Sequence, residues 1–73
     1  MKTIYVTKEW KGYGKQDYHW NEYRLLGDVV TKFNCHRQKL FDGHESYWNR
    51  RETKEISWNI KDLDLPEWLR KYL

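Results

Sequence analysis

Two short turn signals divide this chain, and they constrain its fold more than any other feature. Gly27-Asp28 stands between Leu26 and Val29, and Asp42-Gly43 follows Phe41. Both dipeptides favour two-residue β-hairpin turns, because such turns need a positive φ that glycine adopts at no steric cost. The segments around them are rich in strand-forming residues that alternate at period two. The sequence therefore predicts antiparallel β-hairpins.

We expect strands at residues 3–10, 18–26, 29–41, 44–51 and 55–60, with turns near 12–17 and 52–54 as well as at the two dipeptides. The first hairpin would place Trp10 opposite Trp20, Lys8 opposite Glu22 and Ile4 opposite Leu26. Asp42-Gly43, as a type I′ turn, would pair Phe41 with His44, Gln38 with Tyr47, Arg37 with Trp48 and Cys35 with Arg50. The turn near 52–54 would bring Trp48 opposite Trp58.

The chain ends with a change of period. Large apolar residues recur at helical spacing over Leu65, Trp68, Leu69, Tyr72 and Leu73. Asp64 and Glu67 have the spacing of a capping box, and Pro66 suits a first helical turn. A helix this short is unstable alone in water, so we expect it to dock on the sheet.

The predicted alternation sorts the later strands into two faces. The first is apolar and is expected to lie under the helix: Phe33, Cys35, Phe41, Trp48, Ile56, Trp58 and Ile60. The second is polar: Lys32, Asn34, His36, Gln38, Tyr47, Asn49, Arg51, Ser57 and Asn59. We therefore predict one α+β domain over residues 1–73, a small antiparallel β-meander of four to five twisted strands with one C-terminal amphipathic helix. A small SH3-like or OB-like barrel is the alternative.

Aromatic rings are too numerous for one small core. The chain holds five Trp, six Tyr and two Phe beside 14 Lys and Arg, and its net charge is +3. Exposed rings next to cations are typical of a binding surface, because rings stack bases and cations contact phosphates. On the predicted polar face this selects Lys32, His36, Tyr47, Asn49 and Arg51 as candidate contacts. The plainer interpretation is an ordinary sheet face left in water.

The loop after the first strand is a second candidate contact. Two glycines let its backbone approach a partner, and a ring stands between two cations in Lys11, Tyr13 and Lys15. The segment lacks the spacing of a phosphate-binding loop. An ordinary hairpin loop explains it equally well.

Catalytic and metal motifs are weak in this chain. No His or Cys pair stands at zinc-finger spacing, and Cys35 and His36 point to opposite faces of a strand. We expect no metal, no cofactor and no catalytic residue, so the protein is predicted to be a non-enzymatic binding module. A small ribonuclease using His36, Tyr47, Asn49 and Arg51 is a lesser alternative.

The partner class stays open between two kinds. Rings interleaved with cations favour RNA or single-stranded nucleic acid, whereas a contiguous apolar patch favours a protein or a homodimer. A short chain without Ala and crowded with Trp, Tyr, Asn and Lys resembles the small accessory proteins of bacteriophages. That resemblance implies binding of a host protein or a nucleic acid, and it supports the alternative of a host protein bound and inhibited through exposed aromatic residues. The single cysteine and the lack of a leader or an apolar span predict a cytoplasmic protein without a membrane partner.

Overall fold

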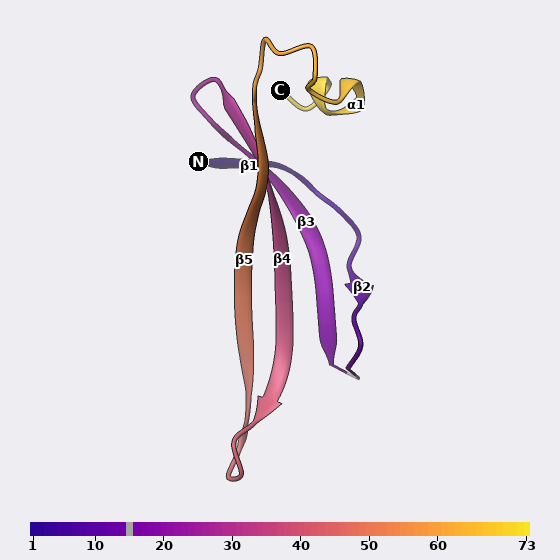
Figure 1. The fold of residues 1–73 in the computed structure, drawn as a ribbon, viewed down its shortest axis with the longest axis vertical. Helices are drawn as coiled ribbons and strands as arrows, with labels where there is room; N and C mark the ends of the chain where they lie inside the picture. Colours follow the sequence, from indigo (N-terminus) through magenta and orange to yellow (C-terminus); the bar gives the residue numbers. More distant parts are fainter. Residues whose placement is uncertain (15) are drawn as a thin grey trace.

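The computed structural model describes residues 1–14 and 16–73 and consists mostly of antiparallel sheet (Figure 1). Its elements are β1 (Lys2–Val6), β2 (Trp10–Lys11), β3 (Asp17–Leu26), β4 (Val29–Phe41), β5 (Ser46–Asn59) and α1 (Glu67–Arg70). The molecule is elongated, with extents of 50 × 20 × 16 Å, because β4 and β5 run on together beyond the rest of the sheet.

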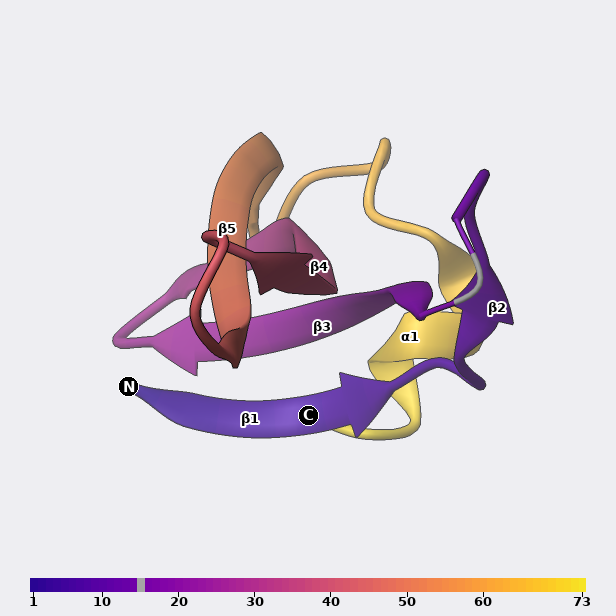
Figure 2. The same cartoon turned by 90° about the horizontal axis from the view of Figure 1, so that it is seen from below.

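The strand order is β1-β3-β4-β5, and β2 adds to β3 beyond the end of β1. Figure 2 shows the strands fanning from β1 to β5, as the right-handed twist of strands requires. Among the described residues β1 and β5 do not pair, so the sheet is open. The predicted antiparallel sheet with a C-terminal helix is confirmed, and the SH3-like or OB-like barrel is not.

The turn between β3 and β4 agrees with the sequence prediction. Leu26 pairs with Val29, so Gly27 and Asp28 form a two-residue loop. Gly27 has φ +60° and Asp28 has no positive φ. A positive φ at the first central position alone is the requirement of a type II′ turn.

The turn between β4 and β5 differs from the prediction. Phe41 pairs with Ser46, so the loop is four residues long rather than two. The Asp42 carboxylate accepts the backbone N–H groups of His44 and Glu45, at 2.9 and 3.0 Å, and this bonding widens the turn. All predicted pairs of this hairpin are therefore wrong by two residues: Gln38 pairs with Asn49, Arg37 with Arg50 and Cys35 with Glu52.

The first predicted strand is interrupted between β1 and β2. The Thr7 hydroxyl accepts the Asn21 N–H at 2.8 Å, and the Thr7 N–H donates to the Asn21 carbonyl at 2.9 Å. A register shift also lies within β1. The predicted pairs Trp10–Trp20, Lys8–Glu22 and Ile4–Leu26 are wrong, because these irregularities move Trp10 opposite His19 and Tyr5 opposite Tyr23.

No turn interrupts β5 at 52–54. Instead Phe33 pairs with Lys54 and Lys32 pairs with Ile56, which leaves Glu55 as an extra residue in a β-bulge. Lys32 holds this residue through an ion pair of 2.8 Å with Glu55. The bulge changes the alternation along β5, so Trp48 and Trp58 lie on opposite faces and do not pair with each other.

The core lies at one end of the sheet. Tyr23, Val30, Leu65 and Leu69 are buried together, and Trp58 packs against them. We call the face that carries Tyr23, Val30 and Trp58 the helix-covered face, and its opposite the open face.

Part of the predicted core face is therefore wrong. Trp58 and Ile60 pack against the helix end as expected. Phe33, Cys35, Phe41 and Trp48 lie on the open face, because the bulge separates their alternation from that of Trp58.

The C-terminal helix is present but shorter than the predicted stripe. α1 spans four residues, and its N-cap is Pro66, with ψ 131° and no capping hydrogen bond from a side chain. The predicted capping box of Asp64 and Glu67 is therefore not formed. Trp68 packs its ring on Tyr5 at a centroid distance of 5.0 Å. In the described part of the chain, no helix has the length and apolar character needed to cross a membrane.

Candidate functional site

The five residues predicted on a polar face do share one face of the sheet. His36 pairs with Arg51, Gln38 with Asn49 and Leu40 with Tyr47, and Lys32 alternates with His36 along β4. They lie on the helix-covered face, along the part of the β4–β5 ribbon that extends beyond α1.

Two of these five side chains are already engaged within the protein. Lys32 pairs with Glu55, and this hydrogen bond raises the pKa of Lys32 above its ordinary value despite partial burial. His36 bonds to the Asp17 carboxylate. Tyr47 and Arg51 are exposed, so they are the members of the set that remain most accessible.

The loop candidates lie beside β2. Lys11 is exposed in β2, and Tyr13 is fully exposed. A hollow of about 300 Å³ is lined by Trp10, Lys11, Gly12, Tyr13 and His19. Lys15 lies outside the described residues.

The open face carries a cluster of rings and guanidinium groups that the sequence analysis did not select. The Arg37 guanidinium lies over two neighbouring rings, 5.1 Å from the centroid of Tyr18 and 4.9 Å from that of Trp48, and these two centroids are 6.4 Å apart. Arg50 lies over Trp20 at 5.5 Å. We call these five residues the aromatic–basic surface.

A carboxylate network borders this surface. Arg24 donates two hydrogen bonds to Glu52, at 2.7 and 3.0 Å, and a third to Glu22 at 3.0 Å. Glu22 also accepts the Trp20 indole N–H at 2.7 Å. Burial raises the pKa of Glu22, but the Trp20 and Arg24 hydrogen bonds outweigh it and hold that pKa below 4.5. The hydrogen bond from Arg24 likewise lowers the pKa of Glu52.

Arg37 and Arg50 are less tightly held than Arg24. Their side chains are 42% and 57% exposed, against 16% for Arg24. Arg37 has one long contact of 3.4 Å to Glu9, and its Nε is buried without a hydrogen-bond partner among the described residues. Arg50 donates to Glu52 at 3.2 Å and lies 3.6 Å from Glu22. Each therefore makes fewer hydrogen bonds than Arg24, which makes four, and keeps more of its side chain in contact with solvent.

A third cluster lies where β2, β3 and β4 meet, and we call it the Asp17 cluster: Asp17, His19 and His36. The two imidazoles stack across the strands with centroids 4.3 Å apart and planes 5° from parallel. His36 bonds to Asp17 Oδ1 through Nε2, and His19 Nε2 lies 3.6 Å from the same oxygen. Burial raises the pKa of Asp17, but His36 and His19 outweigh it, so that the pKa lies below 3.8.

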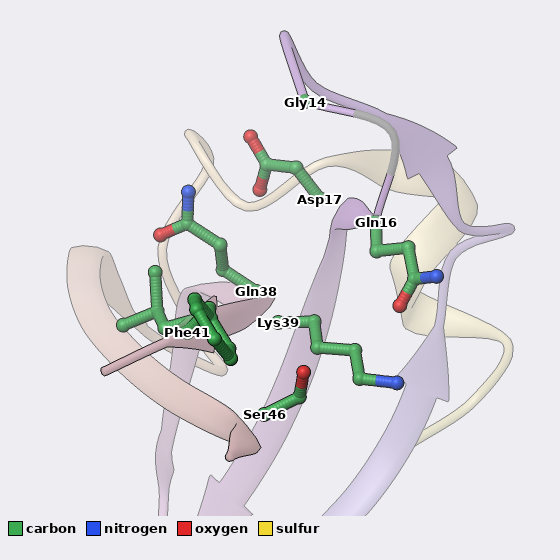
Figure 3. Close-up of a pocket in the computed structure, with 8 residues that line it drawn as sticks. Gly14, Gln16, Asp17, Gln38, Lys39, Phe41 and Ser46 are labelled. Carbon is green, nitrogen blue, oxygen red and sulfur yellow. The ribbon is translucent and has the colours of Figure 1, made fainter. Parts of the chain in front are cut away.

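A hollow of about 360 Å³ opens beside this cluster. Figure 3 shows Asp17, Gly14 and Gln38 around one end of it and Lys39, Phe41 and Ser46 toward the other.

Cross-strand pairing assembles both clusters, and sequence reasoning missed them for that reason. The signal for the Asp17 cluster was present, since counting outward from the Gly27-Asp28 turn places His19 opposite His36. For the aromatic–basic surface, the predicted register already placed Trp48 on the same face as Arg37, but without the bulge at Glu55 that face was expected to lie under the helix.

Comparison with models of known protein families, with curated proteins and with solved structures gave no match for this chain.

Proposed function

We propose that this protein binds single-stranded nucleic acid, preferably RNA, through the aromatic–basic surface. The observation that carries the proposal is Arg37, whose guanidinium lies over both Tyr18 and Trp48 and whose side chain is 42% exposed. A guanidinium that lies over aromatic rings can still donate hydrogen bonds from its exposed N–H groups to a phosphate. Trp48, itself 49% exposed, offers its remaining ring surface to a base.

The charge of the open face supports an anionic ligand. Register and contacts assign six cations to this face: Lys11, Arg24, Arg37, Lys39, Arg50 and Lys54. Among the described residues, three carboxylates contact these cations: Glu9 contacts Arg37, and Glu22 and Glu52 contact both Arg24 and Arg50. The remaining positive charge lies around the rings, where a phosphate backbone would run.

The polar face first selected by alternation is the weaker candidate. Lys32 is committed to Glu55 and His36 to Asp17, so their hydrogen-bonding groups are not free for a ligand. Tyr47 and Arg51 resemble Trp48 and Arg50 in kind, because each pair consists of one aromatic ring and one guanidinium. They therefore serve as matched controls on the opposite face of the same strand.

Fluorescence anisotropy with a labelled oligouridine, at two salt concentrations, tests the proposal. Trp48→Ala is expected to weaken binding by about 1–3 kcal/mol through lost stacking. Arg37→Ala is expected to lower the slope of log K against log salt by about 0.7, the value for one single-strand phosphate contact. Tyr47→Ala and Arg51→Ala are expected to leave binding within about twofold, as surface changes outside a contact do.

Two outcomes would contradict this assignment. Weaker binding in Tyr47→Ala and Arg51→Ala, with normal binding in Trp48→Ala and Arg37→Ala, would move the interface to the helix-covered face. An absence of binding to oligouridine and oligothymidine at low salt would refute a nucleic-acid function.

A protein partner is the second candidate function, favoured by the end of the β4–β5 ribbon. Phe41 is 69% exposed there, and Tyr47 and Trp48 lie beside it with nearly half their surface in solvent. β5 also ends the sheet over 14 residues, which leaves one backbone edge open to strand addition. Phe41→Ser would abolish inhibition of a host protein while leaving oligouridine binding unchanged.

A further inference from the structure

We propose that Asp17, His19 and His36 bind a divalent transition-metal ion, preferably Zn²⁺. These three side chains would leave one coordination position of the ion open. This inference rests on the Asp17 cluster on the helix-covered face and does not depend on nucleic-acid binding by the open face.

The geometry of the cluster is that of a small ligand set. One oxygen of Asp17 and one ring nitrogen from each histidine all lie within 4.8 Å of one another. Asp17 and His19 alternate along β3, and His36 faces His19 from β4. Two adjacent strands therefore hold all three side chains on one face, and the described backbone needs no rearrangement to bring the donors together.

The hydrogen bonding of the cluster is incomplete without a further group. The Asp17 oxygen that bonds to His36 lies 3.6 Å from His19 Nε2, beyond hydrogen-bond distance. Among the described residues, His19 Nε2 has no other partner. A metal ion replacing the proton between Asp17 and His36 would give all three donor atoms a shared partner.

The surroundings hold the donors in place. Trp10 stacks on the outer side of His19, with centroids 5.9 Å apart and planes 17° from parallel. The backbone at Gly12 closes over the cluster, since a Cβ there would lie 2.8 Å from Asp17 Cγ and 2.9 Å from His19 Nε2. Asp17 itself is largely buried, with 10% of its side chain exposed. Such support fixes ring orientation around a metal.

The donor set favours zinc or a neighbouring metal over calcium or magnesium. Imidazole suits Zn²⁺, Ni²⁺, Cu²⁺ and Co²⁺, whereas magnesium and calcium prefer oxygen-only sites. Two imidazoles and one carboxylate leave the fourth tetrahedral position to water, as in exchangeable or catalytic zinc sites rather than closed structural ones. The hollows on either side of the cluster give water and small ligands access to that position.

Thermal unfolding of chelator-treated protein with and without Zn²⁺ tests the site. A ligand that binds only the folded state raises Tm by mass action, and we expect a rise of about 5 °C or more with a large excess of Zn²⁺. His19→Gln should abolish this rise, measured against the metal-free Tm of the same variant, because that variant also loses the stacking of His19 on Trp10 and His36. His44→Gln, in the exposed β4–β5 loop, should keep the full rise.

Histidine side-chain NMR supplies a readout that does not depend on stability. Zn²⁺ should shift the ring resonances of His19 and His36 and leave those of His44 unchanged. Co²⁺ should broaden the same two rings. The proposal is overturned if wild-type protein shows neither a Tm rise nor a ring shift with Zn²⁺, or if His19→Gln and His36→Gln both retain the full wild-type response.

Discussion

The attachment of the C-terminal segment to the sheet predicts a large effect of Leu69→Ala. The Leu69 side chain is fully buried and contacts a core of few residues, among them Val30 and Leu65. Burial of a leucine contributes about 1.5–3 kcal/mol, and the cavity left by truncation brings the usual loss to about 2–5 kcal/mol. Because α1 lies near the end of the chain and can relax inward, we expect about 3 kcal/mol.

That loss is a large share of the free energy of unfolding expected for a chain of this size. At about 0.05–0.15 kcal/mol per residue, 73 residues give roughly 4–11 kcal/mol of stability. Leu69→Ala should therefore lower Tm by about 12–24 °C, at about 4–8 °C per kcal/mol. Urea melts measure the free energy, and a constant m-value would show that the two-state comparison holds.

Leu63→Ala is the matched control. Leu63 precedes the helix by four residues, is 98% exposed, and should lose less than about 0.5 kcal/mol. Equal destabilisation of the two variants would refute the docking of α1 on the helix-covered face. So would an unchanged urea midpoint in Leu69→Ala.

Three further predictions concern the two faces of the sheet. Trp58→Ala should cost about 3–5 kcal/mol in urea melts and Trp48→Ala less than about 1 kcal/mol, because only Trp58 packs into the core; equal losses would contradict the bulge. Glu22 and Glu52 have lowered pKa values, so the stability they contribute is present above pH 4.5 and is lost as pH falls through their folded-state pKa values. In a Glu22→Gln/Glu52→Gln protein the urea midpoint should therefore depend less on pH between pH 7 and pH 3, and an unchanged pH dependence would contradict this. Burial and nearby carboxylates raise the pKa of Cys35 to about 11, so its thiol should react with Ellman's reagent at pH 8 only after denaturation; immediate reaction in the native protein would show that it is accessible.

The sequence predicts features of this fold that depend on neighbouring residues. Gly27-Asp28 forms its two-residue turn because glycine alone carries the positive φ there. The apolar residues after Pro66 bury Leu69 because their spacing places a stripe on one side of a helical turn. Both are local effects, determined within a few positions of the chain.

The failures come from pairings that local sequence does not determine. Asp42-Gly43 has the composition of a two-residue turn, but the Asp42 carboxylate bonds to His44 and Glu45 and produces a longer loop. The bulge at Glu55 is accompanied by the ion pair to Lys32, and it turns Trp58 onto the face that carries the core. One extra residue in a strand exchanges its faces, so a single unpredicted bulge was enough to misplace half of the predicted core face.

The two proposals use opposite sides of the same strand pair, and this makes them separable. Tyr18 and His19 are consecutive in β3, and His36 and Arg37 are consecutive in β4, so each pair sends one side chain to each face. His19→Gln removes a donor of the metal site and leaves the rings around Arg37 in place. If that variant lost both the zinc response and oligouridine binding, the metal would be needed to hold the β3–β4 pairing on which the open face depends. Retention of oligouridine binding in His19→Gln would instead show two independent sites on one sheet.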